Sequence, residues 1–498
     1  MNPTTILLLI AGYFGLLVLV SFFTGKNDSN DTFFKGNKQS PWYVVAFGMI
    51  GATLSGVTFI SVPGMIKDEQ FAYLQGVFGF FVGTLFIILV LLPLFYRLNV
   101  TSIYQYLEQR FGKVSYKTGA FFFLLSRVTG ASFRLFLVAL SMQYIVFAEL
   151  GVPFWITVVL SILLIWIYTF RGGIKTIVWT DTLQTLSMLT AVGVAIYLIL
   201  QKLDLTYIEF LQSEAFASKS KIFHFDDPNS KIYFWKYFIG GIFIAITMTG
   251  LDQDMMQKNL TCKNQKDAQK NMSTMITLLV VFNFIFLSLG ALLFVYADKF
   301  GIEIPFVDGK ERTDLLFPEI AMNSNLGLPL SIVFIIGLIA AAYSSADSAL
   351  TSLTTSFSVD FLGIEKRPQQ EQKPLRQKVH IGVSILLIIV VIIFNQLDGS
   401  VVNNLFTFAT FTYGPLLGLF AFGILTKHKI KDKYAWLVAL GAIALTITIA
   451  FLPESIIGKY KFQWEILPIN GLLTFVGLWL IRKKDEVSES GLKDAKDK

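Results

Sequence analysis

Thirteen stretches of mostly apolar residues, each close to the length needed to cross a bilayer, run through the 498-residue sequence. A membrane-spanning helix needs about 20 such residues, because its backbone polar groups must be satisfied where no water is available. Only 15% of the residues are charged, against roughly 25% in soluble proteins. The sequence therefore predicts an all-α integral membrane protein with 13 transmembrane helices. The stretches are residues 6–23, 42–66, 71–96, 119–148, 154–170, 177–200, 233–250, 275–296, 326–357, 379–394, 401–425, 434–452 and 464–481.

Lysine and arginine are unevenly divided between the loops on the two sides of the predicted membrane. The loops and tail on one side carry 28 of them, and the loops on the other side carry 11. Because positive charge favours the cytoplasmic side, we expect a multi-pass protein of the plasma (inner) membrane with its N-terminus outside and its C-terminus in the cytoplasm. This division also accounts for the net charge of +7 without a nucleic-acid partner.

The residue composition gives little support to catalytic or redox chemistry. Cys262 is the single cysteine and there are three histidines, which excludes an intramolecular disulfide and argues against a His/Cys metal site. The sequence has no Gly-x-x-x-x-Gly-Lys-Ser/Thr phosphate-binding loop, so nucleotide hydrolysis is not the energy source. No nucleophile, histidine and acid occur together at membrane depth, which argues against an enzyme. Active transport by this chain would therefore run on an ion gradient.

Two of the predicted spans are rich in residues that interrupt a helix. Residues 48–58 combine three glycines with Ser and Thr, and residues 240–250 combine three glycines with Thr before Asp252. The two spans lie five apart, so the second enters the membrane in the opposite direction, as an inverted repeat of five helices requires. Small residues also allow close helix packing. The pairing favours broken helices that line a transport site, and argues against a continuous pore.

Two arginines fall inside the fourth span, where a charge is costly. Arg127 is the shallower one, and its long side chain can reach the interface or a neighbouring carbonyl group. Arg134 lies seven residues deeper, near the middle of the bilayer. It is suited either to bidentate binding of a carboxylate or to pairing with a buried Asp.

Two aspartates also fall within spans. Asp181 lies in the first turns of its helix, where a plain capping role is an alternative. Asp347 lies deep in its helix and shares a face with Ser344 and Ser348. A carboxylate and hydroxyl groups are hard oxygen ligands, which suit an alkali cation and not a transition metal.

With these features the chain resembles the sodium:solute symporters, a family that includes bacterial sialic acid, proline and galactose carriers. The resemblance rests on the thirteen-span plan and on residues 52–59, 168–174, 179–181 and 340–345. It implies the LeuT-type fold, with a five-plus-five inverted repeat, and Na⁺-coupled alternating access. The implied organisation is a leading helix and loop (1–41), repeat one (42–200), an outer loop (201–232), repeat two (233–425) and two additional helices with a cytoplasmic tail (426–498).

The same resemblance assigns ligands for one or two coupling Na⁺ ions. The first site would use backbone carbonyls and two hydroxyls, from Gly51, Leu54, Ala341, Ser344 and Ser345. The second would use Asp181, Ser344, Asp347 and Ser348. The sialic acid branch has Ser where this chain has Asp347, and the extra carboxylate would strengthen a second Na⁺ site or hold a proton. We take two Na⁺ per cycle as the hypothesis.

The resemblance places the solute between the two broken helices. The implied lining residues are Thr53, Ser55, Thr58, Gln75, Arg134, Phe243 and Thr247. Hydroxyls, an amide, one guanidinium and an aromatic wall suit a small polyhydroxylated or acidic solute. We favour an organic anion such as sialic acid or another carboxylate. A Na⁺/sugar, amino-acid or inorganic-anion symporter and a transporter-like solute sensor are the alternatives, and no protein partner is inferred.

Overall fold

The protein is almost entirely helical in the computed structural model, which describes residues 3–24, 29–143, 147, 150–170, 173–307, 310–324, 326–395 and 401–483. Within these ranges, eight helices are long and apolar enough to cross a membrane, and two bent pairs bring this number to ten. Two shorter apolar helices, α9 and α22, add to these. In the described ranges, strand structure is limited to the hairpin of β1 (Phe306–Val307) and β2 (Lys310–Glu311).

The helices follow the predicted apolar stretches along the whole chain. The helices of the first half that follow these stretches are α1 (Pro3–Thr24), α3 (Trp42–Gly64), α5 (Tyr73–Phe86) continued by α6 (Leu92–Leu98), α8 (Lys113–Met142), α9 (Phe154–Thr169) and α10 (Ile174–Leu203). Those of the second half are α13 (Phe234–Ala245), α14 (Gln253–Leu260), α15 (Gln265–Phe300), α17 (Leu328–Ser356), α18 (Gln369–Phe394), α19 (Val401–Leu425), α20 (Ala435–Ala450) and α22 (Ile466–Leu480). Short connecting helices are α2 (Asn30–Lys35), α4 (Ile66–Glu69), α7 (Gln105–Arg110), α11 (Tyr207–Gln212), α12 (Glu214–Ala217), α16 (Leu316–Asn323) and α21 (Glu454–Ile457).

Several helices extend beyond the stretches that hydrophobicity predicts. For example, α18 begins ten residues before the predicted residue 379, because its first turns are helical but polar, and hydrophobicity does not detect them. Parts of some predictions lie outside the described residues: residues 144–146 and 148 of the fourth stretch, Arg171 and Gly172 of a family motif, and the tail from residue 484.

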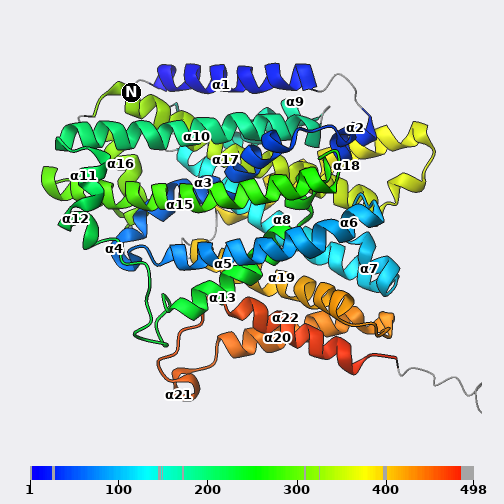
Figure 1. Ribbon diagram of the computed structural model, residues 1–498. Helices are drawn as coiled ribbons and strands as arrows, with labels where there is room; N and C mark the ends of the chain where they lie inside the picture. The colour runs from blue at the N-terminus through cyan, green and yellow to red at the C-terminus, as the bar shows by residue number, and fades with distance from the viewer. Residues whose placement is uncertain are drawn as a thin grey trace, which may run out of the picture.

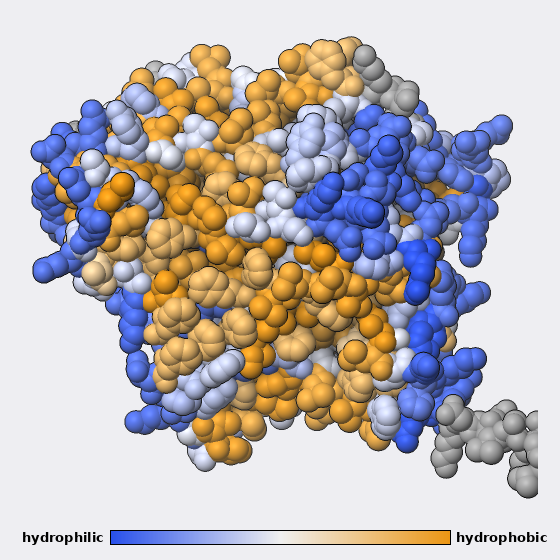
Figure 2. Space-filling view, in the orientation of Figure 1, coloured by the Kyte–Doolittle hydropathy of each residue, from blue (hydrophilic) through white to orange (hydrophobic). Residues whose placement is uncertain are grey.

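Most long helices lie roughly along one common axis (Figure 1). In this view α1, α10, α15 and α5 lie one below another, and α20 and α22 pack on α19 at the opposite side. Figure 2 shows a broad hydrophobic surface between two polar ends of these helices. Large apolar side chains such as Leu8, Phe22 and Leu89 are about 70% exposed. A surface of this kind is stable when lipid covers it.

The two predicted interruptions are confirmed. The helix α3 bends by 58° next to Ser55, whose φ of 47° and ψ of 167° are not helical. The second bend, of 62°, separates α13 and the π-helical turn η4 (Ile246–Gly250) from α14. Both bends free backbone groups from the helical hydrogen-bond pattern, which is tolerated inside a membrane protein where those groups line a site.

Glycines allow α5 and α13 to approach each other closely. A Cβ atom on Gly79 would collide with the carbonyl oxygen of Phe238, and one on Gly241 would collide with the carbonyl oxygen of Gly76. Backbone atoms cannot move aside as a flexible side chain can. This contact therefore holds a helix of the first half against the bent helix of the second half, in the manner of small-residue packing in membranes.

Candidate sodium and solute sites

A buried polar cluster joins α10 to α17 in the interior of the bundle. Asp181 of α10 is fully buried and accepts a hydrogen bond of 2.6 Å from Ser344 Oγ. Ser348 Oγ lies 3.4 Å from the second oxygen of the same carboxylate. The structure therefore brings together three of the four residues predicted for the second sodium site.

The same carboxylate forms an ion pair that the sequence did not reveal. Lys258 Nζ lies 2.7 Å from Asp181 Oδ2, and the lysine side chain is only 1% exposed. Lys258 is one of the 28 lysines and arginines of the predicted cytoplasmic side, because it follows the seventh apolar stretch. The sequence feature that could have revealed this pair is the run of polar residues after Gly250. This run forms α14, all eight residues of which are buried.

Asp347, the fourth predicted ligand, turns its oxygens to other donors. Tyr168 donates its hydroxyl to Oδ2 at 2.7 Å, and the backbone N–H of Ser348 donates to Oδ1 at 2.6 Å. All three residues are buried. Tyr168 belongs to a motif of the sequence analysis, but its role as a partner of Asp347 was not predicted.

The first predicted sodium site contains a hydroxyl without a hydrogen-bond partner. Ser345 Oγ is buried and has no partner within the described ranges. A buried polar atom in this condition is expected to bind something that the protein itself does not supply. The hydroxyl of Ser344 donates its proton to Asp181, which leaves its lone pairs available to a cation. Oxygen donors without nitrogen or sulfur fit an alkali cation.

The backbone ligands predicted for this site lie at the bend of α3 and on α17. Gly51 and Leu54 belong to the last helical turn before Ser55, where carbonyl groups lose their partners inside the helix. Ala341 lies on α17, which packs against α3. A side chain on Gly51 would collide with the Thr185 hydroxyl of α10, so glycine allows the close approach of α3 and α10 at this level.

Arg134 is the predicted solute residue whose environment is most informative. The side chain is half-buried in the second half of α8. It forms no hydrogen bond or salt bridge with any residue in the described part of the chain. By contrast, Arg127 pairs with Asp254 and lies 3.8 Å from Asp252, the residue that caps α14. The shallower arginine is thus held by the protein, and the deeper one is free to bind a ligand.

Four of the residues predicted to contact the solute carry hydroxyl groups and lie at or near the two bends. Thr53 and Thr247 each bond back to a carbonyl one turn earlier, that of Met49 and of Phe243 respectively, at 2.8 Å. Such a hydroxyl retains its lone pairs as acceptors for a ligand. Ser55 is buried at the bend itself, and Thr58 is half-buried just beyond it.

Gln75, also predicted to contact the solute, is occupied by the protein in this conformation. Its amide nitrogen donates to the carbonyls of Ala72 and Ile232 at 3.1 and 3.0 Å. Its oxygen accepts the backbone N–H of His224 at 3.0 Å. These bonds attach the loop before α13 to the beginning of α5, so Gln75 reaches a solute only if this loop moves.

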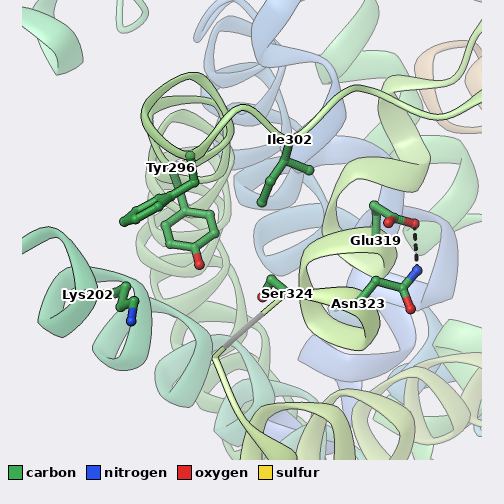
Figure 3. Close-up of a pocket in the computed structure, with 7 residues that line it drawn as sticks. Lys202, Tyr296, Ile302, Glu319, Asn323 and Ser324 are labelled. Atoms are coloured by element: carbon green, nitrogen blue, oxygen red, sulfur yellow. Dashed lines mark hydrogen bonds between the residues drawn. The ribbon is translucent and has the colours of Figure 1, made fainter.

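A cavity of about 370 Å³ lies elsewhere, where α10, α15 and α16 end (Figure 3). Glu319 and Asn323, which share a hydrogen bond of 2.9 Å, form part of its wall. The other lining residues are Lys202, Tyr296, Phe300, Ile302 and Ser324. None of the residues predicted for the sodium or solute sites lines this cavity.

A mostly helical protein with an apolar surface, two bent helices and buried carboxylates and hydroxyls between them has the features of a secondary transporter. Comparison with known proteins gives the family. The model of the Sodium:solute symporter family matches residues 33–432, and the chain belongs to this family. It is therefore a multi-pass, sodium-coupled symporter, which moves a solute together with Na⁺.

Individual relatives are similar over most of their length. A sodium/sialic acid symporter of Proteus mirabilis is 25% identical over 84% of this chain and 84% of its own. Sodium-coupled monocarboxylate transporter 1 of Mus musculus is 27% identical over 84% of this chain and 68% of its own. A solved structure of a Na⁺-coupled sialic acid symporter in a substrate-bound, outward-open state superposes with a TM-score of 0.82, at 21% identity, over 96% of this chain and 98% of that one. This last likeness shows that the fold is shared.

Proposed function

We propose that this symporter imports an organic anion, such as sialic acid or another carboxylate, by alternating access. The observation that carries the proposal is Arg134, a half-buried cation with no hydrogen bond or ion pair to the described residues. An unpaired charge inside a membrane protein is costly. A carboxylate offers a guanidinium group two parallel hydrogen bonds and one opposite charge, which a neutral sugar does not.

The relatives support the same class of solute. Sialic acid and monocarboxylates, which appear in the names of two relatives, both carry a carboxylate. The hydroxyls of Thr53, Ser55, Thr58 and Thr247 would bind the polar remainder of the solute, and Phe243 would supply an apolar wall. Gln75 would join them after the loop before α13 moves.

The proposed primary sodium site consists of the carbonyls of Gly51, Leu54 and Ala341 with the hydroxyls of Ser344 and Ser345. The unpartnered hydroxyl of Ser345 supports it. Since the site joins α3 to α17, Na⁺ would fix the distance between these helices and so favour one conformation of the carrier.

We further propose the arrangement of the chain in the membrane. Thirteen spans would form LeuT-type inverted repeats at 42–200 and 233–425, preceded by 1–41, separated by the outer loop 201–232 and followed by 426–498. The excess of lysine and arginine supports an outside N-terminus and a cytoplasmic C-terminus. Transport in this scheme requires no catalytic step and neither a nucleic acid nor a protein partner.

The decisive test compares solutes that differ only in the carboxylate. In proteoliposomes that contain the purified protein, unlabelled sialic acid and its methyl ester would compete with a labelled carboxylate for uptake. We expect the acid to compete and the ester to lose about 10- to 100-fold in affinity, the equivalent of about 1.4–2.8 kcal/mol. In Arg134→Gln this difference would disappear.

Other outcomes of this test would contradict the proposal. Equal competition by the acid and the ester would exclude recognition of a carboxylate. Uptake restricted to neutral sugars, amino acids or inorganic anions would give Arg134 a structural role. Binding without uptake would indicate a solute sensor.

A further inference from the structure

We propose that the ε-ammonium group of Lys258 is the resident cation of the second predicted sodium site, and that the carrier therefore couples one Na⁺ to each solute. The inference rests on the proposed primary sodium site and replaces the hypothesis of two ions. It concerns three ionisable side chains, Asp181, Asp347 and Lys258, which are buried together in the interior.

The position of the ammonium group is incompatible with a second ion on the same carboxylate. Lys258 Nζ lies 2.7 Å from Asp181 Oδ2, the oxygen that also faces Ser348 Oγ. A Na⁺ ion bound to this oxygen would lie beside the ammonium, and two like charges repel strongly where no water screens them. The remaining oxygen of Asp181 already accepts the hydroxyl of Ser344.

The second carboxylate does not supply a replacement site. Asp347 is bound to the hydroxyl of Tyr168 and to the N–H of Ser348. Each of its oxygens therefore already accepts one hydrogen bond from the protein. Because the ammonium of Lys258 occupies the Asp181 oxygen that Ser348 faces, a second Na⁺ ion would lack this ligand.

Lys258 lies beside Asp181 because the residues before and after it in α14, Gln257 and Asn259, are hydrogen-bonded to other helices. Gln257 donates to the carbonyl of Phe34 at 2.8 Å and to Thr355 Oγ1 at 2.9 Å. Asn271 Nδ2 donates to Asn259 Oδ1 at 2.7 Å. With both neighbours anchored to other helices, the lysine is directed at Asp181 and is not a mobile loop residue.

The charges also balance with a single ion. With both carboxylates ionised, the two carboxylates and one ammonium carry one negative charge, which one Na⁺ at Ser345, two residues from Asp347, would neutralise. A second Na⁺ would leave an uncompensated positive charge in the interior, which is unfavourable. On this account Asp347 compensates for the charge of Lys258.

The number of ions can be measured in two independent ways. The first is the ratio of labelled Na⁺ to labelled solute taken up by proteoliposomes, for whichever solute is transported. The second uses purified protein without solute: the dependence of its thermal stability on Na⁺ concentration reports the number of ions bound. We expect a ratio of 1:1, and a stability dependence that corresponds to one ion.

Three variants test the role of the ammonium. Lys258→Met removes the charge and frees Asp181, so a second Na⁺ should bind and the stability dependence should double. Lys258→Arg keeps the charge and should still bind one ion. The double variant Asp181→Asn/Lys258→Met lacks both charges and should also bind one ion, and it serves as a control if Lys258→Met does not fold.

A 2:1 ratio in the unmodified protein would overturn the inference. So would a Lys258→Met protein that folds and still binds one ion. A protein that shows no Na⁺-dependent stabilisation at all would instead contradict the primary sodium site of the proposed function. A change of solute class would leave both ion counts unaffected.

Discussion

At the scale of single residues, some polar side chains in the interior have hydrogen-bond or ion-pair partners within the protein, and others have none. Arg127, Asp181 and Asp347 each have protein partners. Arg134 and Ser345 have none among the described residues. Because unsatisfied buried groups are costly, these two are the residues at which a bound solute and a bound cation would contribute most.

Ser345 gives the first prediction. In Ser345→Ala, the loss of one oxygen ligand should raise the Na⁺ concentration for half-maximal uptake about 10-fold, or about 1.4 kcal/mol. The affinity for solute at saturating Na⁺ should change much less. Ser352→Ala is the matched control, since this serine of the same helix bonds back to the carbonyl of Ala349. Equal effects of the two substitutions would mean that Ser345 is not a sodium ligand.

The residue types of the candidate site were predictable from the sequence, but their pairing was not. A charged residue inside an apolar stretch stands out, which is how Arg134, Asp181 and Asp347 were identified. Lys258 lies outside every apolar stretch, and its burial results from contacts of α14 with α17, nearly a hundred residues later. The bonds of Gln75 to the loop before α13 depend on long-range contacts of the same kind.

At the scale of helices, the candidate site lies at the two bends, next to the glycine contact between α5 and α13. Glycine, serine and threonine in residues 48–58 and 240–250 predicted both bends, because these residues weaken a helix locally. Hydrophobicity did not predict the polar helix ends, which carry few apolar residues, or the helices α11 and α12, which at six and four residues are too short to give a spanning stretch. Helix length therefore exceeds span length at several positions.

The glycine contact gives the second prediction. In Gly79→Ala, the new Cβ atom would meet the backbone of α13, which should cost about 1–3 kcal/mol and lower the thermal unfolding temperature in detergent. Gly193→Ala is the control, because the space around this helical glycine of α10 is open. Its unfolding temperature should stay the same or rise slightly, because alanine favours helix. A smaller loss for Gly79→Ala than for Gly193→Ala would contradict the packing described.

At the scale of the whole molecule, an apolar surface between two polar ends (Figure 2) agrees with a chain that crosses the bilayer many times. The sequence predicted this class of fold because hydrophobic stretches of about 20 residues have few alternatives to a membrane. It also predicted the family. Of the 13 predicted spans, the described residues show eight to ten helices of spanning length, and α9 and α22 are shorter, at 16 and 15 residues.

Orientation gives the third prediction. Cys262, the single cysteine, is buried, so a Cys262→Ser background allows one labelling site at a time. A membrane-impermeant maleimide should label Ala215→Cys, in α12 of the outer loop, on intact cells. Gln370→Cys, at the exposed beginning of α18, should react only after the membrane is opened. The reverse pattern would invert the proposed topology.

The most direct test of the central claim is solute accumulation driven by sodium. Proteoliposomes that contain the protein and labelled sialic acid on both sides would receive an inward Na⁺ gradient, with an equal K⁺ gradient as the control. We predict uphill accumulation with Na⁺ alone, its collapse when a sodium ionophore removes the gradient, and its absence in Arg134→Gln. Equal uptake under both cations, or accumulation in Arg134→Gln that matches the unmodified protein, would contradict a sodium-coupled carrier that binds a carboxylate at Arg134.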